Sequence, residues 1–414
     1  MFYFRNHPFL ISLSIIFLCS IISCTSRNDA KTSNLLRNDA QTGNPLTVEM
    51  RENLSKNVPI TFSEEITRVE YVPLELTDDG ASALAESLDI SVTDEYIFVY
   101  SMKVNAILQF SRMDGKFIRQ LATLGGGPDE TQLIVCFYAD ETARRIYVVQ
   151  HNNILEFTFD GTFIVSHPQT REISYQYPVG DNLIAEVGRE RVPFSSPNLI
   201  GMGVFKRNGE TIAVKNNFAR PDIFPANASC IKDVLRAFSG QSLLYFIGSN
   251  DTVFRLTSDA IQPAFVLNRK NSRKSLEGAL HPRMEAMQPN DFWIYDFFET
   301  SKSFYVRSIF DEDKMYIFAL DKATNLTTTE ISGISPQEIF GFDRWMLGIG
   351  IHIGDEKIPL WPTKTYLDKN ILVQYMPAPE IFYLKEKGVI NKLPTEIEFI
   401  NEESNPIVII YHLE

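Results

Sequence analysis

A short hairpin recurs along the chain at a nearly constant interval, and this recurrence constrains the fold more than any other feature. In each copy two strand-like segments flank a two-residue turn, at Asp114-Gly115, Asp160-Gly161 and Asn208-Gly209. Both central residues of the favoured hairpin turn adopt positive φ, which Gly, Asn and Asp tolerate best. The turn glycines are 46 and then 48 residues apart. The sequence therefore predicts a β-structure made of repeated units of this length.

Three further copies follow at wider spacing, with turns near Ser258-Asp259, Asp321-Lys322 and Lys387-Gly388. A further strand-like run stands before the first, second, fourth and fifth hairpins: EYIFVY, RRIYVV, SLLYFIG and SFYVRSIF. Four-stranded units of about 40 to 50 residues are typical of propeller blades. We therefore predict an all-β fold, a six-bladed β-propeller. The alternative is an irregular β-sandwich with coincidental hairpins.

The N-terminus has the pattern of a secretion signal. Arg5 precedes a mainly apolar run over residues 9–19, interrupted only by Ser12 and Ser14. That run is shorter than the roughly 20 residues of a membrane-spanning helix, although a buried core helix is an alternative. After Ser20 the run is followed by Ile-Ile-Ser-Cys at residues 21–24, which resembles the lipobox of bacterial lipoproteins. The resemblance implies cleavage before Cys24, acylation of Cys24 and attachment of the mature protein to a membrane.

These features divide the chain into three parts. Residues 1–23 are the expected lipoprotein signal peptide, residues 24–57 a lipidated N-terminus and flexible linker, and residues 58–414 the six-bladed propeller. The linker is polar and carries an approximate repeat, RNDAKT followed by RNDAQT. It has too few large apolar side chains to offset the entropy of ordering, so we expect a flexible tether. A partner-binding segment is the alternative.

Five motifs of the propeller region stand in a characteristic order: ITRVEYVPLEL, FSRMDGKF, LGGGPDE, DTVFRL and SNPIVIIYHL. Together they resemble the six-bladed β-propeller lipoproteins of Bacteroidetes, which are NHL-like propellers. The resemblance implies that the two chain ends share one blade, with VEYVPLEL paired to PIVIIYHL. The chain departs from the family at Gly126, where a basic residue is common, and at residues 129–131. The ligand contacts of those missing side chains are therefore not carried over.

Charge and motif content exclude several classes of function. The formal net charge is −13, which opposes binding to nucleic acid or to an anionic membrane surface. The LGGGPDE loop has no lysine and places acids where a phosphate needs donors, so no nucleotide cofactor is expected. The cysteine and histidine spacings suggest no metal, so we expect no cofactor at all. The sequence leaves undecided whether Cys136 and Cys230 form a disulfide, because the alternative is that Cys136 is a buried free thiol.

Two histidines and two aromatic residues are the candidate ligand face. His151 stands in a turn between strands and His281 in the polar segment HPRME, so either could line the mouth of the channel. A solvated loop position is the alternative for both. Trp293 and Tyr295 lie on one face of the aromatic run DFWIYDFFE, where they could stack against a sugar, joined by Trp345 or Trp361. The alternative is a strand packed between two blades.

A binding function fits these features best. We expect a lipid-anchored protein of the cell envelope, held at the outer membrane and facing the periplasm or the medium, whose propeller binds a protein or glycan partner. The alternative is a propeller enzyme, a lyase or hydrolase, with its site at the central channel. Titratable side chains from at least three blades would have to converge there. A structural accessory of an outer-membrane transport complex is a third possibility.

Overall fold

The computed structural model describes residues 44–414 apart from a set of internal segments. The omitted segments are 63–64, 85–88, 128, 132–133, 151–152, 169–173, 181–182, 189–199, 208, 217–233, 240–241, 249, 271, 273–290, 311–313, 332–350, 352 and 354–357.

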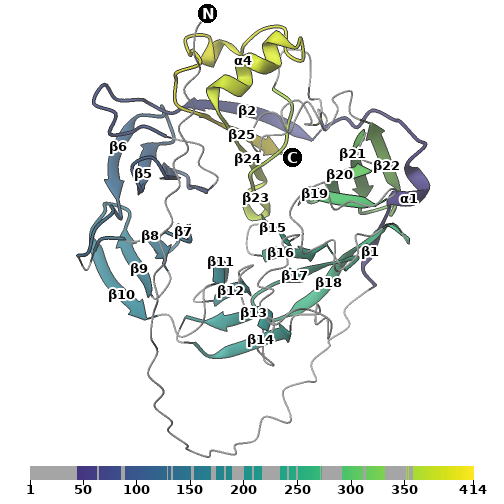
Figure 1. Cartoon of the computed structure of the whole chain (residues 1–414), viewed down its shortest axis with the longest axis horizontal. Helices are drawn as coiled ribbons and strands as arrows, with labels where there is room; N and C mark the ends of the chain where they lie inside the picture. The colour runs from purple at the N-terminus through teal and green to yellow at the C-terminus, as the bar shows by residue number, and fades with distance from the viewer. Residues whose placement is uncertain are drawn as a thin grey trace, which may run out of the picture. The chain divides into compact units, whose positions relative to one another are not determined.

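The described residues form a six-bladed β-propeller, as the hairpin repeat predicts (Figure 1). Each blade has four antiparallel strands, which follow one another along the chain in blades one to five, whereas the fourth strand of blade six comes from the start of the propeller. A single parallel pair, Ser239 of blade four with Thr365 of blade six, joins these two blades in one sheet. Blade one contains β3 (Ile90–Val92), β4 (Tyr96–Ser101), β5 (Ala106–Ser111) and β6 (Phe117–Leu121). Blade two contains β7 (Cys136–Asp140), β8 (Arg145–Val149), β9 (Asn153–Thr158) and β10 (Phe163–Pro168). Blade three contains β11 (Ser174–Gly180), β12 (Leu183–Gly188), β13 (Ile200–Lys206) and β14 (Thr211–Asn216).

The later blades follow the same plan. Blade four contains β15 (Val234–Ser239), β16 (Ser242–Ile247), β17 (Thr252–Leu256) and β18 (Ile261–Asn268). Blade five contains β19 (Phe292–Glu299), β20 (Ser303–Phe310), β21 (Lys314–Asp321) and β22 (Thr327–Ile331). Blade six contains β23 (Lys364–Tyr366), β24 (Ile371–Met376), β25 (Ile407–Leu413) and β2 (Ile66–Pro73). The first strand of each blade, from β3 to β23, is the inner one.

The hydrophobic core lies between the blades. One cluster of buried side chains joins blades six and one, another joins blades one and two, and a third joins blades four and five. A strand between two such clusters buries both faces, as β20 does along almost its whole length. Burial on both faces explains why the strands read as continuous apolar runs rich in Phe.

Blade six closes the ring by joining the two ends of the propeller. β2 pairs antiparallel with β25, with Tyr71 opposite Ile409, which confirms the predicted pairing of VEYVPLEL with PIVIIYHL. Glu70 of β2 accepts hydrogen bonds from Arg68 and from His412 of β25. Arg112, next to the first hairpin, approaches the same carboxylate at 3.5 Å and so ties the closing strand to blade one.

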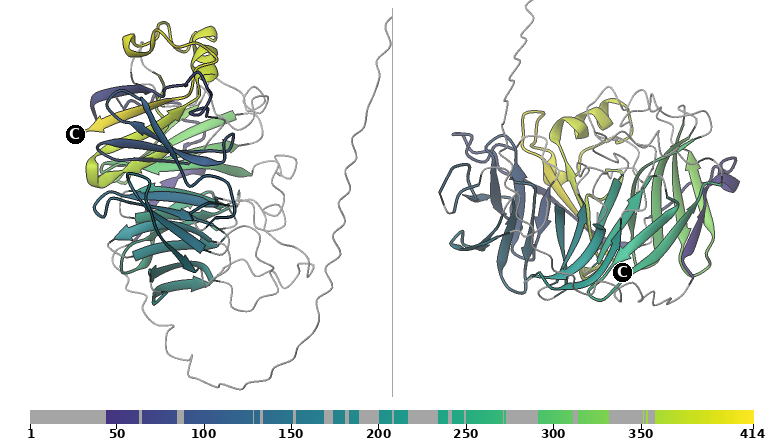
Figure 2. Two further views of the ribbon diagram at one scale, coloured as in Figure 1. Left: turned by 90° about the vertical axis from the view of Figure 1, so that its left-hand side faces the viewer. Right: turned by 60° about the horizontal axis from the view of Figure 1, so that its bottom comes forward.

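The sixth hairpin of the sequence prediction is wrong, although the sixth blade exists. Its first half is the helix α4 (Ala378–Glu386), which lies with the short 3₁₀ helix η3 (Thr395–Ile397) against blade six (Figures 1 and 2). Ile381 and Leu384 are buried three residues apart, which is helical spacing. Gly388 has φ of +70° and ends the helix, so the Lys387-Gly388 pair is a helix C-terminus and not a hairpin turn.

The propeller also begins before the expected boundary at residue 58. β1 (Leu46–Glu49) pairs in parallel with β18 as a fifth strand of blade four, and α1 (Met50–Asn53) follows it. Val48 and Met50 are fully buried in the cluster between blades four and five. The burial of this apolar surface stabilises the folded conformation of β1 and α1. The sequence prediction assigned both to the linker because most of the neighbouring residues are polar.

The hairpin glycine of blade one should tolerate substitution less than that of blade three. Gly115 and Gly209 both have positive φ, so either alanine variant loses about 1–2 kcal/mol. A Cβ on Gly115 would lie 1.9 Å from the carbonyl oxygen of Pro73, whereas a Cβ on Gly209 meets nothing within 4 Å. We expect urea unfolding to show Gly115→Ala less stable than Gly209→Ala by a further ~1–3 kcal/mol. Equal losses would contradict the contact with β2.

The closing carboxylate should make stability depend on acid pH. Burial raises the pKa of Glu70, but the His412 hydrogen bond and the cations Arg112 and Arg68 outweigh it, so the pKa lies below its usual 4.5. Its stabilising effect is therefore complete above about pH 4.5 and is lost as pH falls through the lower folded pKa. The stability difference between wild type and Glu70→Gln should be largest near pH 6 and shrink towards pH 3.

Denaturant unfolding across this pH range measures the effect. Glu403→Gln is the control, because Glu403 is exposed in a loop. If the stability difference between wild type and Glu70→Gln stayed constant with pH, the ionised carboxylate of Glu70 would not be stabilising the closure of the ring.

Candidate functional site: an axial pocket

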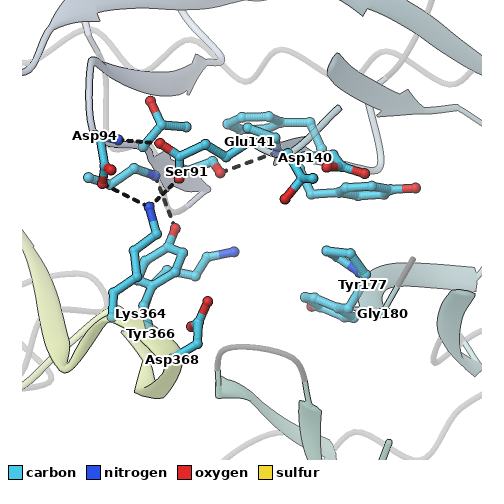
Figure 3. Close-up of a pocket in the computed structure, with 17 residues that line it drawn as sticks. Ser91, Asp94, Asp140, Glu141, Tyr177, Gly180, Lys364, Tyr366 and Asp368 are labelled. Carbon is cyan, nitrogen blue, oxygen red and sulfur yellow. Dashed lines mark hydrogen bonds and ion pairs between the residues drawn. The ribbon is translucent and has the colours of Figure 1, made fainter. Parts of the chain in front are cut away.

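A pocket of about 380 Å³ opens at the centre of the propeller (Figure 3). Its walls come from β3, β7, β11 and β23 and from the residues that directly follow β3, β7 and β23. These inner strands belong to blades one, two, three and six. Blades one and two are connected here through Ser91, whose hydroxyl oxygen accepts the Ala139 N–H at 3.3 Å.

Lys369 links three blades at one side of the pocket. It lies in the 3₁₀ helix η2 (Leu367–Lys369), directly after β23, and the left-handed Asn370 ends that helix. Its Nζ donates to Asp94 Oδ1 of blade one at 3.0 Å and to Glu141 of blade two. Glu141 also accepts the Asp94 N–H at 2.6 Å, as the dashed line in Figure 3 marks. The three side chains therefore hold the ends of three inner strands together.

A second lysine, Lys364 of β23, is largely buried in the pocket wall. Its Nζ donates to Asp89 Oδ1 at 3.1 Å, and only 15% of its side chain is exposed. Asp89 directly precedes β3 and also accepts the Phe137 N–H of β7 at 3.0 Å. The Tyr177 ring of β11 lies 5.8 Å from Nζ. Blades six, one, two and three thus meet around one ammonium group.

Both lysines are held in their charged form. Burial acts to lower the pKa of Lys364, but the Asp89 carboxylate more than offsets it and raises that pKa well above its ordinary value. For Lys369 burial acts in the same way, and hydrogen bonds to Glu141 and Asp94 again raise the pKa. Neither amine is therefore available as a base or nucleophile near neutral pH.

A third ion pair lies at the border between blades two and three. Asp140, at the end of β7, pairs with Arg207 at 3.2 Å. The guanidinium of Arg207 stacks over the Tyr147 ring at 3.7 Å from its centroid, and Tyr147 stacks on Tyr138 of β7. Tyr138 lines the pocket and is almost fully buried, which raises its pKa. The position of Asp140 is therefore fixed by Arg207, which itself packs on the stacked pair Tyr147 and Tyr138.

The sequence-predicted site residues do not lie in this pocket where the structure describes them. Trp293 and Tyr295 are on β19 of blade five, and neither lines the pocket. His151 and His281 lie outside the described residues, as do Cys24, Cys230 and Trp345. Cys136 is buried at the start of β7, where its Sγ lies 3.8 Å from the Gln176 carbonyl oxygen.

Trp293 and Tyr295 instead join a separate cluster. Their rings lie 5.8 Å apart, and a β-bulge at Tyr295 shifts the register between β19 and β20. Trp361 donates its Nε1–H to Asp296 at 3.0 Å and stacks under Arg307 at 3.9 Å. Burial raises the pKa of Asp296 and lowers that of Arg307 to about 10. Trp361 lies in the same hydrophobic cluster as Trp293 and Tyr295, packed against the mainly buried strand β19.

The pocket residues were missed because no motif marks them. Asp94 and Glu141 occupy similar places, since each follows the inner strand of its blade in an acidic turn, VTDEY and ADETARR. Superposing the blades of the repeat at this position would have found both acids. The two lysines have no such signal, because β23 is only three residues long.

Within the described part of the chain, no three His, Cys, Asp or Glu side chains come together as a metal site requires. No helix among the same residues is long and apolar enough to cross a bilayer.

Comparison with known proteins places the chain in a family. Residues 45–412 match the family described as "Domain of unknown function (DUF4934)". The chain belongs to the DUF4934 family. No curated protein matches this DUF4934 chain significantly. The match begins at residue 45, next to the start of β1, which agrees with a propeller that includes β1.

One of the solved structures similar to this DUF4934 protein supports its fold. One is a protein of Bacteroides fragilis described as exported, with a TM-score of 0.59 and 16% identity over 90% of this chain and 100% of that chain. Another is a DUF4221 family member from Bacteroides vulgatus, with a TM-score of 0.46 and 9% identity over 85% and 99% of the two chains. At this identity the first similarity concerns the fold alone.

Proposed function

We propose that this DUF4934 protein is a lipid-anchored protein of the cell envelope whose propeller binds a protein or glycan partner in the axial pocket. The signal pattern and Cys24 support export and anchoring, with the outer membrane favoured because Thr25 follows the cysteine. The structurally similar protein of Bacteroides fragilis, described as exported, agrees with this location.

The observation that carries the binding role is the construction of the pocket. Four blades meet there, and the charged groups of Lys364, Lys369 and Asp140 are each held by a partner from another blade. Such fixed groups can recognise a ligand without rearranging, which reduces the entropy lost on binding. The volume of about 380 Å³ lies within the ~300–1,000 Å³ range of ligand pockets.

A propeller enzyme is the second candidate, because carboxylates and lysines from three blades, one, two and six, do converge at the channel. General-base and nucleophilic lysines need a neutral amine near pH 7. The carboxylate partners of Lys364 and Lys369 raise both pKa values and so oppose that chemistry. Binding is therefore the better supported of the two functions.

Lipid anchoring predicts a specific loss on substitution of Cys24. Cells that express the full chain and grow with labelled palmitate should label the wild-type protein and Cys19→Ser, but not Cys24→Ser. Cys19 is the matched control, since it lies in the same signal segment. Immunoprecipitation followed by detection of the label measures the effect, and label retained by Cys24→Ser would refute acylation there.

Occlusion of the pocket should abolish binding. Thr142 is exposed at the pocket wall, so a tryptophan there fills the mouth without disturbing the core, whereas Thr162 is exposed in the outer hairpin of the same blade. The full-length protein in detergent is tested on a glycan array and by crosslinking to solubilised envelope proteins. We expect wild type and Thr162→Trp to retain a partner that Thr142→Trp loses, with the ligand recovered chemically unchanged.

Two results would overturn this proposal. The same binding by both tryptophan variants would move the binding site away from the pocket. Turnover of a ligand that depends on the open pocket would instead establish the enzyme.

A further inference from the structure

The ammonium group of Lys364 has hydrogen-bonding capacity directed at the pocket. An ammonium carries three N–H donors, and among the described residues Lys364 uses one, to Asp89 at 3.1 Å. The group is held in the wall by this bond and faces the Tyr177 ring at 5.8 Å. Two donors therefore remain for the oxygen atoms of a ligand.

The charges around this group disfavour an anionic ligand. Asp89 balances Lys364 and Arg207 balances Asp140, whereas Lys369 pairs with two carboxylates, Asp94 and Glu141, and Asp368 adds another, so the lining carries an excess of negative charge. A ligand anion at Lys364 would have to share the ammonium with Asp89 and pass the exposed carboxylates of Asp94 and Asp368. A ligand cation could pair with Asp94 or Asp368, but a cationic group does not supply the acceptor oxygens that the N–H donors of Lys364 require. Breaking the Lys364–Asp89 or the Arg207–Asp140 pair, both largely buried, would leave a charge without its partner, which is costly.

The same set of groups suits hydroxyl groups. A sugar hydroxyl both donates and accepts, so it can accept from the Lys364 ammonium and donate to a carboxylate oxygen while every ion pair stays intact. Tyr177 and Tyr366, both half-buried, place aromatic rings on the walls from blades three and six. An aromatic wall beside a few fixed polar groups is the usual composition of a small-molecule site.

We propose that the axial pocket recognises a neutral carbohydrate, a mono- or disaccharide unit, with two of its oxygen atoms bound by Lys364 and a ring face against Tyr177. This inference rests on the proposed binding function and specifies its ligand. Asp89 is the positioning residue, because it holds the ammonium while itself anchored to the Phe137 N–H.

Calorimetric titration of the full-length protein in detergent tests the ligand class. The probes are the neutral disaccharides maltose, cellobiose and N,N′-diacetylchitobiose, the acidic digalacturonate, and the cationic dimer of glucosamine, each at 50 and 500 mM salt. We expect a neutral disaccharide to bind with an affinity that changes less than about twofold with salt, since no net charge is matched. Binding of only a charged probe, or of no disaccharide, would overturn the inference.

Substitutions test the role of Lys364. Lys364→Met should weaken neutral-sugar binding about tenfold or more, because hydrogen bonds from a charged donor are lost. Lys322→Met is the matched control, since Lys322 is a similarly buried lysine, 3.1 Å from Glu299 and outside the pocket. The double variant Asp89→Asn with Lys364→Met removes both charges together and serves if the single variant does not fold. Equal affinity in the Lys364 variants and the control would overturn the assignment.

The outcome also separates this inference from the broader proposal. A charged saccharide or an envelope protein that binds wild type but not Thr142→Trp would leave the pocket as a binding site and refute only the neutral-sugar assignment. Loss of every pocket-dependent ligand would refute both.

Discussion

The pairing of β2 with β25 is the interaction on which the rest of the structure depends. It places a strand from the start of the propeller beside the last strand of the chain, so blade six is complete and packs against blade one. Without it both blades would expose apolar faces and strand edges. The pocket depends on the same closure, since Lys364 and Lys369 come from blade six while Asp89 and Asp94 come from blade one.

The ion pairs of the pocket connect blades to one another and also line the candidate binding site. Each joins different blades at the ends of the inner strands, where the apolar packing between blades stops and polar groups face the axis. Buried and half-buried pairs contribute little net stability, because desolvation offsets their attraction. What they provide is a fixed arrangement of donors and acceptors, and that arrangement is what a binding site requires.

The sequence alone predicted the ring better than the site, for physical reasons. Hairpin turns are local and need glycine at positive φ, as Gly115 has, so they leave a readable pattern. Gly388 misled because a helix C-terminus has the same requirement. The pocket pairs are not local: Lys369 and Asp94 are 275 residues apart, and only the closed ring brings them together. The aromatic run around Trp293 is easily seen in the sequence, but it reflects packing of β19 in a hydrophobic cluster and not a ligand site.

The N-terminal strand β1 and the pocket belong to different blades. β1 joins the outer edge of blade four, and its Glu49 N–H donates to Thr327 of blade five at 3.0 Å. The pocket is lined by residues of blades one, two, three and six. Blades four and six are nevertheless parts of one hydrogen-bonded sheet, because Ser239 of β15 pairs with Thr365 of β23. The strand that enters the propeller and the strand that carries Lys364 are thus joined through one continuous sheet, so the order of β1 and the shape of the pocket depend on the same set of backbone hydrogen bonds.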